Sequence, residues 1–340
     1  MVRRSPVSLA ICALILGTAC GKQGLDGNVF RQGDVAFRVG PIPSNWRQIE
    51  TNVENDLPNF AFRDDDVIVA TYAKSGTTWT QQIVGQIVFD GAEDVPIHEI
   101  SPWLDLRVMP PDTMAKLEAQ THRRVVKTHL PLDALTFSPR ARYIYIARDG
   151  RDVLWSLYSH HSNGNDLFYQ LLNETPGRVG PPLGRPDPDI SRYFRRWVEE
   201  DGYPFWSFWE NIATWWAARA LPNVLLVHFA DLKADLGGEM RRIAAFLGCD
   251  VAEERWPLLV EHCTFDYMKA HAEKVAPLGG AIFDGGAKAF INKGVNGRWR
   301  DVLTAKDVRD YEAMALERLG PECAAWLANG RLAEADRLAA

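Results

Sequence analysis

Short runs of apolar residues alternate with segments of helical periodicity along the chain. The run at residues 67–71 is rich in β-branched side chains and follows a charged turn at residues 64–66, which predicts a buried strand. After a loop at residues 72–76, apolar side chains recur at helical spacing over residues 78–89 and predict a helix. This part of the chain therefore has the order strand, loop, helix.

The same order returns further along the chain. Strands are predicted at residues 124–127 and 143–147, the second followed by a helix at residues 151–160. Another strand is predicted at residues 224–228, with a helix at residues 236–247 behind it. Strands that alternate with helices form largely parallel sheets covered by helices. The chain is therefore predicted to fold as a single α/β domain with a central, mostly parallel sheet flanked by helices.

The first 20 residues have the layout of a signal-like leader. Arg3 and Arg4 precede an apolar run at residues 7–16, and small residues stand just before Cys20. The pattern is typical of a bacterial export signal, and Cys20 suggests a lipoprotein processing site. The alternative is an upstream start assigned to a cytosolic protein.

Behind this leader, residues 21–40 are expected to form a linker and residues 41–335 the folded domain. We expect the protein to act in the cytoplasm, with export or a lipid anchor through the leader as the alternative. The apolar run of the leader is too short to span a bilayer, so no stable membrane contact is expected unless Cys20 is lipidated.

Composition fits an ordinary globular protein of 340 residues, 46% hydrophobic and 24% charged. Lys and Arg total 38 against 44 Asp and Glu, a formal charge of −6. This balance gives no overall basic field, so we expect no nucleic-acid partner and only local anion sites. The five cysteines and the adjacent His160 and His161 lack metal-ligand spacing, so no metal site is expected. The oligomeric state is left open.

The loop between the first predicted strand and helix carries phosphate-binding chemistry. Backbone N–H groups and the positive end of a helix can receive an anion at such a turn. A lysine and three hydroxyl side chains add to this chemistry in the string Lys74-Ser75-Gly76-Thr77-Thr78-Trp79. The lysine precedes the glycine, so the string is not the G-x-x-x-x-G-K-[ST] phosphate loop. Hydroxyl residues are also ordinary helix caps, but a lysine at a helix N-terminus opposes the dipole unless an anion is present.

This string resembles the 5′-phosphosulfate loop of the soluble, cytosolic-type sulfotransferases, whose donor is 3′-phosphoadenosine 5′-phosphosulfate (PAPS). Two further segments match the family's catalytic-base and 3′-phosphate segments: Lys127-Thr128-His129-Leu130-Pro131, and residues 145–153 with Ser156. The last match is a glycine-rich segment, called the closing loop below: Lys293-Gly294-x-x-Gly297-x-Trp299. The resemblance runs from about residue 40 to 330 and implies the P-loop, nucleotide-kinase-like fold of that family.

The resemblance makes His129 the catalytic base. This residue follows the predicted strand 124–127, so it is expected at the carboxyl edge of a parallel sheet, where α/β folds place ligands. An imidazole there can take a proton from a hydroxyl as the hydroxyl attacks. The resemblance also implies that Lys74 assists the leaving phosphate oxygen and that Lys127 points to the same side as the base. It further implies that Ser156 interacts with both Lys74 and the 3′-phosphate.

The resemblance distributes the donor's phosphates over several segments. The 5′ end is assigned to the loop residues Lys74, Ser75, Gly76, Thr77 and Thr78. The 3′-phosphate is assigned to Arg148 and Ser156, with Asn292, Lys293 and Gly294 around the closing loop. Asn292 stands where the family usually has arginine, so one bidentate phosphate contact is in doubt.

Aromatic residues are expected to form the flat walls that an adenine requires. Trp79 and Phe265 fall where the family stacks its base. Trp103 is a candidate for the acceptor pocket. With 12 tryptophans in the chain, core packing is the competing interpretation for any one of them.

The sequence thus predicts an enzyme that transfers a sulfuryl group from PAPS, without a metal, to a hydroxyl or amine of a small acceptor. An ATP-dependent phosphotransferase is the enzyme alternative, and the absent nucleotide-binding phosphate loop argues against it. A lipid-anchored, non-catalytic binding protein is the second alternative. The signal-like leader supports this alternative, whereas the presence of Lys74 and His129 argues against it. The identity of the acceptor does not follow from the residues.

Overall fold

The structure is a computed structural model that describes residues 29–32, 35–38 and 61–339, apart from residues 94, 107, 109, 111, 136, 179 and 180. The predicted leader, residues 1–20, lies outside this part of the chain. Within the predicted linker, β1 (Val29–Gln32) and β2 (Val35–Arg38) pair as an antiparallel hairpin.

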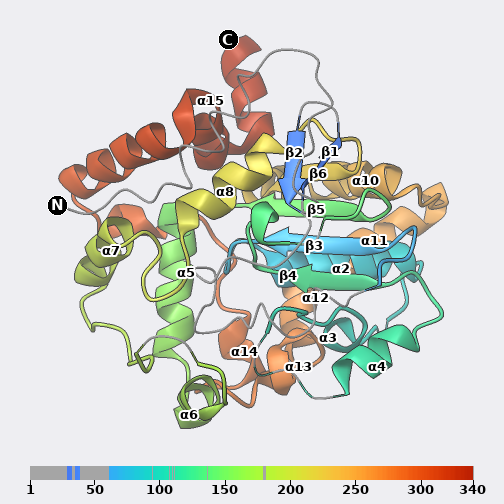
Figure 1. Ribbon diagram of the computed structural model, residues 1–340, viewed down its shortest axis with the longest axis horizontal. Helices are drawn as coiled ribbons and strands as arrows, with labels where there is room; N and C mark the ends of the chain where they lie inside the picture. The colour runs from blue at the N-terminus through green and yellow to red at the C-terminus, as the bar shows by residue number, and fades with distance from the viewer. Residues whose placement is uncertain are drawn as a thin grey trace.

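Four parallel strands form the central sheet (Figure 1). Val67 at the start of β3 pairs with residues of two neighbouring strands, Val125 of β4 and Arg142 of β5. The predicted parallel sheet is confirmed, and each strand begins and ends within one residue of its predicted range. The spatial order is β4-β3-β5-β6, with β3 at Val67–Thr71, β4 at Val125–Thr128, β5 at Arg142–Ala147 and β6 at Val224–His228.

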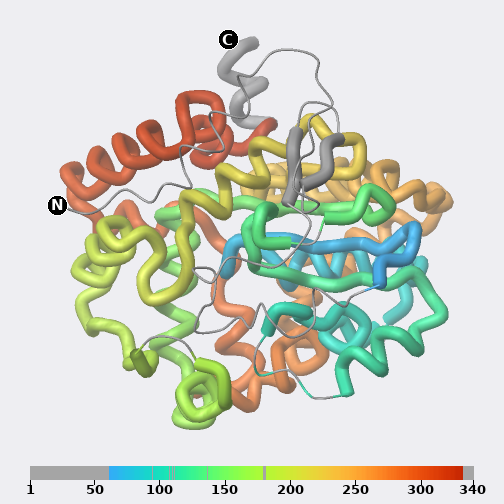
Figure 2. The backbone as a smooth tube through the Cα atoms, in the orientation of Figure 1, coloured from blue at the N-terminus to red at the C-terminus, as the bar shows by residue number. Residues whose placement is uncertain are grey.

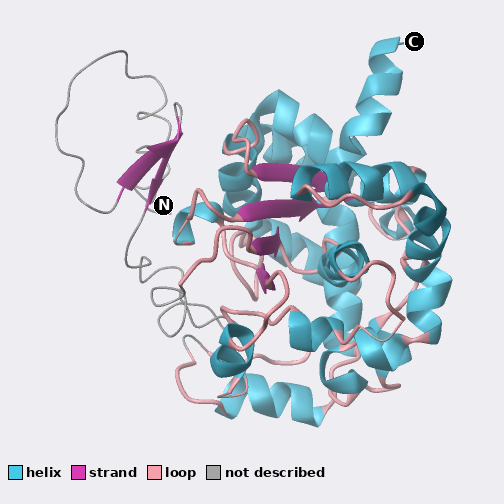
Figure 3. Cartoon of the chain, turned by 90° about the vertical axis from the view of Figure 1, so that its right-hand side faces the viewer, coloured by secondary structure: helices cyan, strands magenta, loops and turns pink. Residues whose placement is uncertain are grey.

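Helices cover both faces of the sheet, because side chains alternate along each strand and both sets are apolar. Val67 and Val69 face a core shared with α2 (Thr77–Val88), α10 (Leu236–Leu247) and α11 (Trp256–His262). Figure 1 shows these helices behind the strands, and Figure 3, turned by 90°, shows helices surrounding the sheet.

The opposite face of the sheet, with Ile68 and Ala70, packs against a second core. Its helices lie along the top and left of Figure 1. They are α5 (Gly150–Ser162), α7 (Ile190–Glu199), α8 (Phe208–Ala217) and α15 (Ala305–Ala339). Backbone angles outside the helical range bend α15 at Gly320 and Gly330.

Shorter helices build the lower half of the molecule, where segments far apart in the sequence lie side by side (Figure 2). His98 in α3, for example, makes a hydrogen bond of 2.5 Å to the carbonyl oxygen of Val275 in α13. No helix among the described residues is long and apolar enough to cross a membrane. These shorter helices are α3 (Ile97–Ile100), α4 (Thr113–Glu118), α6 (Asp166–Glu174), α12 (Phe265–Ala270), α13 (Ala272–Val275) and α14 (Ala287–Phe290). Helix α9 (Phe229–Ala234) instead follows β6 and contacts α10 and α15.

Candidate active site

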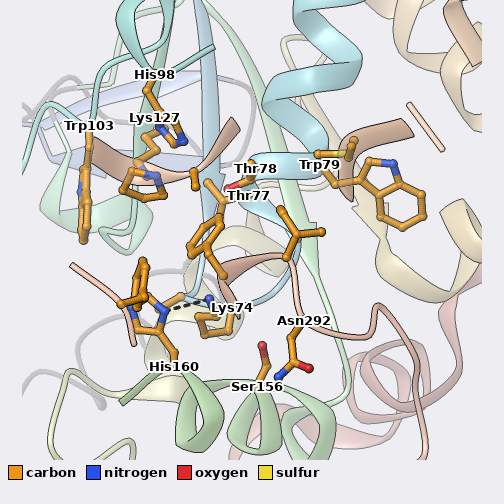
Figure 4. A pocket seen from close by; sticks show the side chains of 18 of the residues that line it. Lys74, Thr77, Thr78, Trp79, His98, Trp103, Lys127, Ser156, His160 and Asn292 are labelled. Carbon is orange, nitrogen blue, oxygen red and sulfur yellow. Dashed lines mark hydrogen bonds between the residues drawn. The ribbon is translucent and has the colours of Figure 1, made fainter. Parts of the chain in front are cut away.

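A cavity of about 1270 Å³ opens at the carboxyl edge of the sheet (Figure 4). Its wall contains residues that follow each of the four strands: Lys74 after β3, His129 after β4, Arg148 after β5 and Phe229 after β6. Open α/β sheets bind ligands at this edge because the loops there converge.

All the predicted site residues except Ser75 line this cavity. The hydroxyl of Ser75 is buried without a hydrogen-bond partner among the described residues, and its N–H donates to the carbonyl of Tyr72 (3.3 Å). Ser75 therefore belongs to the turn rather than to the cavity wall. The lining residues are Lys74, Gly76, Thr77, Thr78, Trp79, Lys127, His129, Arg148, Ser156, Phe265, Asn292, Lys293 and Gly294.

The loop after β3 turns through left-handed backbone conformations. Lys74 has a φ of 66°, and Gly76, the N-cap of α2, has a φ of 119°. A Cβ at Gly76 would lie 2.9 Å from Cδ1 of Ile146, so the turn requires glycine there. The first turn of α2 contains no acidic side chain, so the positive end of this helix at the cavity is not neutralised within the helix.

His129 is held in one orientation at the end of β4. Its Nδ1 lies 2.9 Å from both the carbonyl oxygen and the hydroxyl oxygen of Thr71. Its backbone N–H donates to Asp105 (3.3 Å), and its carbonyl accepts a hydrogen bond from the Asn211 amide (2.9 Å). Because a carbonyl only accepts, we assign the ring proton to Nδ1, which leaves a lone pair on Nε2.

Burial sets the charge of His129. Burial, together with smaller effects of the Lys127 and Lys74 cations, lowers the pKa of the imidazole from 6.5 to about 3. The ring is therefore neutral near pH 7, as a proton acceptor must be. An anion bound beside these lysines opposes their effect and raises the pKa of His129.

Aromatic and cationic groups surround the His129 ring. The Trp103 ring packs edge-on against it, with centroids 4.5 Å apart, and the Lys127 ammonium lies 4.8 Å from the Trp103 centroid. Figure 4 shows these groups together with His98, which sequence reasoning missed. Burial and the Lys127 cation lower the pKa of His98 to about 4.

Lys74 makes a contact that sequence reasoning also missed. Its ammonium lies 3.2 Å from Nδ1 of His160, drawn as the dashed line in Figure 4, and 4.7 Å from the centroid of the Phe290 ring. His160 lies on α5 one turn after Ser156, and this i,i+4 spacing was the available signal. The contact between Lys74 and Ser156 stays a prediction.

The start of α5 holds the closing loop. Arg148 donates from Nε to the side chain of Asn296 (3.0 Å) and from Nη2 to the carbonyl of Val295 (2.9 Å). Asp152 accepts a hydrogen bond of 2.7 Å from the N–H of Gly297, and burial raises the pKa of this carboxyl to about 6. These bonds keep the loop against the cavity. Its residue Arg298, another omission of sequence reasoning, also lines the cavity.

Trp79 and Phe265, the two aromatic residues predicted to stack on the base of a nucleotide, both line the cavity. Trp79 donates from Nε1 to the carbonyl of Cys263 (2.7 Å), which fixes the indole. Phe265 lies so close to Gly294 that a Cβ there would be 2.6 Å from Cδ2 of the ring. The closing loop thus approaches the Phe265 ring through a glycine whose φ is 61°.

The cavity also has a large apolar wall, formed by α6, α14 and the segment between α13 and α14. Leu278 in that segment is 63% exposed although it lines the cavity. Within the described ranges, no three His, Cys, Asp or Glu side chains come together as a metal site. The apolar wall includes Phe168, Leu171, Leu172, Ile282, Phe283 and Phe290.

The fold and the site define an α/β group-transfer enzyme for an anionic donor. The family model for the sulfotransferase domain matches residues 64–320. A glycolipid sulfotransferase of Mycobacterium bovis is 34% identical over 296 residues, which cover 79% of this chain and 89% of that protein. Human sulfotransferase 2B1 is 32% identical over 298 residues, covering 85% of this chain and 74% of that protein.

Two solved structures are similar to this chain in fold. Retinol dehydratase in complex with androsterone and the inactive cofactor PAP matches with a TM-score of 0.60 and 26% identity, covering 77% of this chain and 83% of that one. Mouse sulfotransferase SULT7A1 complexed with PAP has a TM-score of 0.61 at 19% identity, covers 92% of this chain and 100% of that one, and supports the fold alone.

The chain therefore belongs to the sulfotransferase family and is a PAPS-dependent enzyme, as the four motifs predicted.

Proposed function

We propose that this sulfotransferase transfers the sulfuryl group of PAPS to a hydroxyl of an apolar acceptor, with His129 as the general base. One observation carries the proposal. The neutral His129 ring, with Nδ1 bonded to Thr71, lines the cavity in which two lysines and a large apolar wall meet.

The cavity residues suit the charges and the shape of PAPS. The N-terminus of α2 and Lys74 can bind the 5′ phosphosulfate, and Arg148 and Lys293 add positive charge for a second phosphate. Phe265 offers a flat face for the adenine, and a side chain at Gly294 would push this ring away. PAPS supplies the sulfuryl group when bound.

The chemistry follows from the protonation states of the side chains. His129 accepts the proton of the acceptor hydroxyl at Nε2 while the acceptor oxygen bonds to sulfur. The bond between sulfur and the bridging phosphate oxygen breaks, and the charge that develops on this oxygen is stabilised by the Lys74 ammonium. Lys127, beside the base, stabilises charge on the transferring group. Orientation and fixed positive charge thus lower the barrier.

The proposed acceptor is apolar because the wall beyond His129 is built of aromatic and aliphatic side chains. A hydroxyl benefits most from a base, since an amine is already nucleophilic. The glycolipid sulfotransferase of M. bovis, 34% identical, makes a hydroxyl-bearing lipid the first acceptor to test.

A radiolabelled transfer assay tests this function. The purified protein is incubated with ³⁵S-labelled PAPS and hydroxyl acceptors that range from simple phenols to sterols and glycolipids, with a chelator present. We expect transfer without added metal, increasing with acceptor apolarity. Activity that requires magnesium and uses ATP as the donor would show that the protein is a phosphotransferase instead.

We further propose a cytoplasmic site of action, because the donor is made from ATP in the cytosol. The experiment is the isolation of the mature protein from soluble and membrane fractions, with determination of its N-terminus. A lipidated Cys20 at the N-terminus of a membrane-bound form would overturn this proposal.

A further inference from the structure

The geometry points to His160 as a positioning residue for Lys74. We propose that Nδ1 of His160 accepts one N–H of the Lys74 ammonium and so fixes the direction in which the ammonium presents its other two N–H groups. The inference rests on the proposed function of Lys74 at the leaving oxygen.

The contact itself is specific. Nζ of Lys74 lies 3.2 Å from Nδ1 of His160, within hydrogen-bond distance. An ammonium has three donors and no acceptor, so the imidazole nitrogen must accept. With Nδ1 accepting, the proton of the neutral ring lies on Nε2. The same ammonium lies 4.7 Å from the Phe290 centroid, where the ring face attracts a cation.

A neutral partner suits this lysine. Burial is the main reason that His160 stays uncharged, and the Lys74 cation beside it acts in the same direction. A carboxylate in this place would cancel the charge of Lys74. A neutral imidazole holds the ammonium and leaves its full positive charge available to the leaving oxygen.

The surroundings of His160 connect the lysine to the apolar wall. Its ring centroid lies 4.9 Å from that of Phe283, 5.5 Å from that of Phe168 and 6.0 Å from that of Phe290. These rings restrict the imidazole, whereas a lysine on a flexible four-carbon stem has no such restriction of its own. His160 thus provides the rigid contact that Lys74 needs.

Two substitutions at this position separate the roles of the nitrogen and the ring. His160→Phe keeps an aromatic ring but removes the acceptor, and His160→Asn restores an acceptor near the position of Nδ1. Loss of a charge-assisted hydrogen bond predicts at least a tenfold lower kcat for His160→Phe at saturating acceptor. The Kd of PAP, the 3′,5′-bisphosphate left after PAPS loses its sulfuryl group, should stay within about threefold of the parent's value when measured by calorimetry. His160→Asn should recover most of the parent's kcat.

The effect must also act through Lys74. In a Lys74→Ala background, His160→Phe should cause no further loss of the residual rate. An unchanged kcat in His160→Phe, or equal losses with and without Lys74, would overturn the proposal. A deficient His160→Asn with normal PAP affinity would overturn it as well.

His161→Phe is the control variant, since Nδ1 of this neighbouring histidine bonds instead to the Tyr193 hydroxyl (3.0 Å). We expect it to lower the melting temperature but to keep the kcat of the folded enzyme. The parent enzyme and Lys74→Ala test the proposed function separately. If the parent transfers sulfate and Lys74→Ala keeps only a small residual rate, failure of the His160 predictions concerns His160 alone.

Discussion

The proposed base, His129, lies in an environment that lowers its basicity before the donor binds. A hydrogen bond to Thr71 fixes the proton on Nδ1, and burial beside Lys127 disfavours the imidazolium. An anionic donor bound in the cavity that both lysines line is expected to offset part of their positive charge. We therefore expect donor binding to make His129 a better proton acceptor for the acceptor hydroxyl.

Replacing His129 tests its role directly. His129→Gln removes the base, so kcat should fall by roughly 10²–10⁴, the usual contribution of general base catalysis. The affinity for PAP should change little because the proposed partner of the ring is the acceptor. His122→Gln is the control, since this half-buried histidine bonds to the carbonyl of Arg123 and does not line the cavity. Retention of most of kcat in His129→Gln would exclude His129 as the base.

The titration of His129 should depend on the donor site. Because burial and two lysines lower its pKa to about 3, the ring should stay neutral from pH 8 to pH 5 in the free enzyme. With PAP bound, the pKa should rise, since added negative charge favours the imidazolium. ¹⁵N NMR of the histidine rings, assigned with His129→Gln, measures both states. A pKa near 6.5 in the free enzyme would contradict the proposed environment.

The closing loop and the start of α5 act as one unit. Asp152 binds the N–H of Gly297, and Arg148 binds Val295 and Asn296. The loop is therefore already placed beside the cavity, and its glycine can approach Phe265.

The close approach at Gly294 gives a sharp prediction. In Gly294→Ala the new Cβ would meet Phe265 at 2.6 Å, so the ring must move and PAP affinity should fall about tenfold or more. Gly248→Ala is the matched control, because its φ of 69° carries similar backbone strain while no atom lies within 4 Å of the Cβ. Calorimetry should find the parent's PAP affinity in Gly248→Ala. Equal losses in both variants would mean that backbone strain alone is responsible.

A substitution at Asn292 tests whether the closing loop binds the 3′-phosphate. Arginine offers two parallel charge-assisted hydrogen bonds where asparagine offers one neutral donor group. Asn292→Arg should therefore tighten PAP binding about tenfold, with no gain for the plain 5′-monophosphate. Arg148→Ala should weaken PAP binding and reduce the preference for the 3′-phosphate. Equal affinity of the parent for both nucleotides would show that the 3′-phosphate site lies elsewhere.

The molecule as a whole depends on the sheet that carries these loops. A buried ion pair joins the residues just before β3 and β4: Nε of Arg124 lies 2.8 Å from Oδ1 of Asp66. Both side chains are about 1% exposed or less. The pair lies at the start of two adjacent strands, and loops that line the cavity leave from the opposite ends of these strands.

Breaking this pair should destabilise the whole fold. Asp66→Asn leaves the Arg124 charge buried with less compensation, which costs about 3 kcal/mol of unfolding free energy. Asp64→Asn removes an exposed pair with Arg140 and should cost less than about 1 kcal/mol. Denaturant unfolding of the two variants provides the comparison. Equal and small losses would show that the buried pair contributes little.

Much of this architecture follows from local patterns. Apolar runs mark β3 and β6 at their observed bounds, because a strand covered on both faces is largely apolar. Short motifs that contain glycine, lysine and histidine identify the loops after the strands. Glycine permits a tight turn, and lysine and histidine supply groups that bind anions or transfer protons. All the predicted site residues except Ser75 therefore line the cavity, whereas its lining residues His98, His160 and Arg298 were not predicted.

Contacts between distant segments needed the folded chain. The pairing of Lys74 with His160 joins residues 86 positions apart, and the low pKa of His129 arises from burial by segments that no motif connects. The apolar wall is likewise assembled from α6, α14 and the segment before α14, which carry no common signal. Periodicity and motifs report what a residue can do locally, whereas the free energy of a charge depends on every group that the fold places around it.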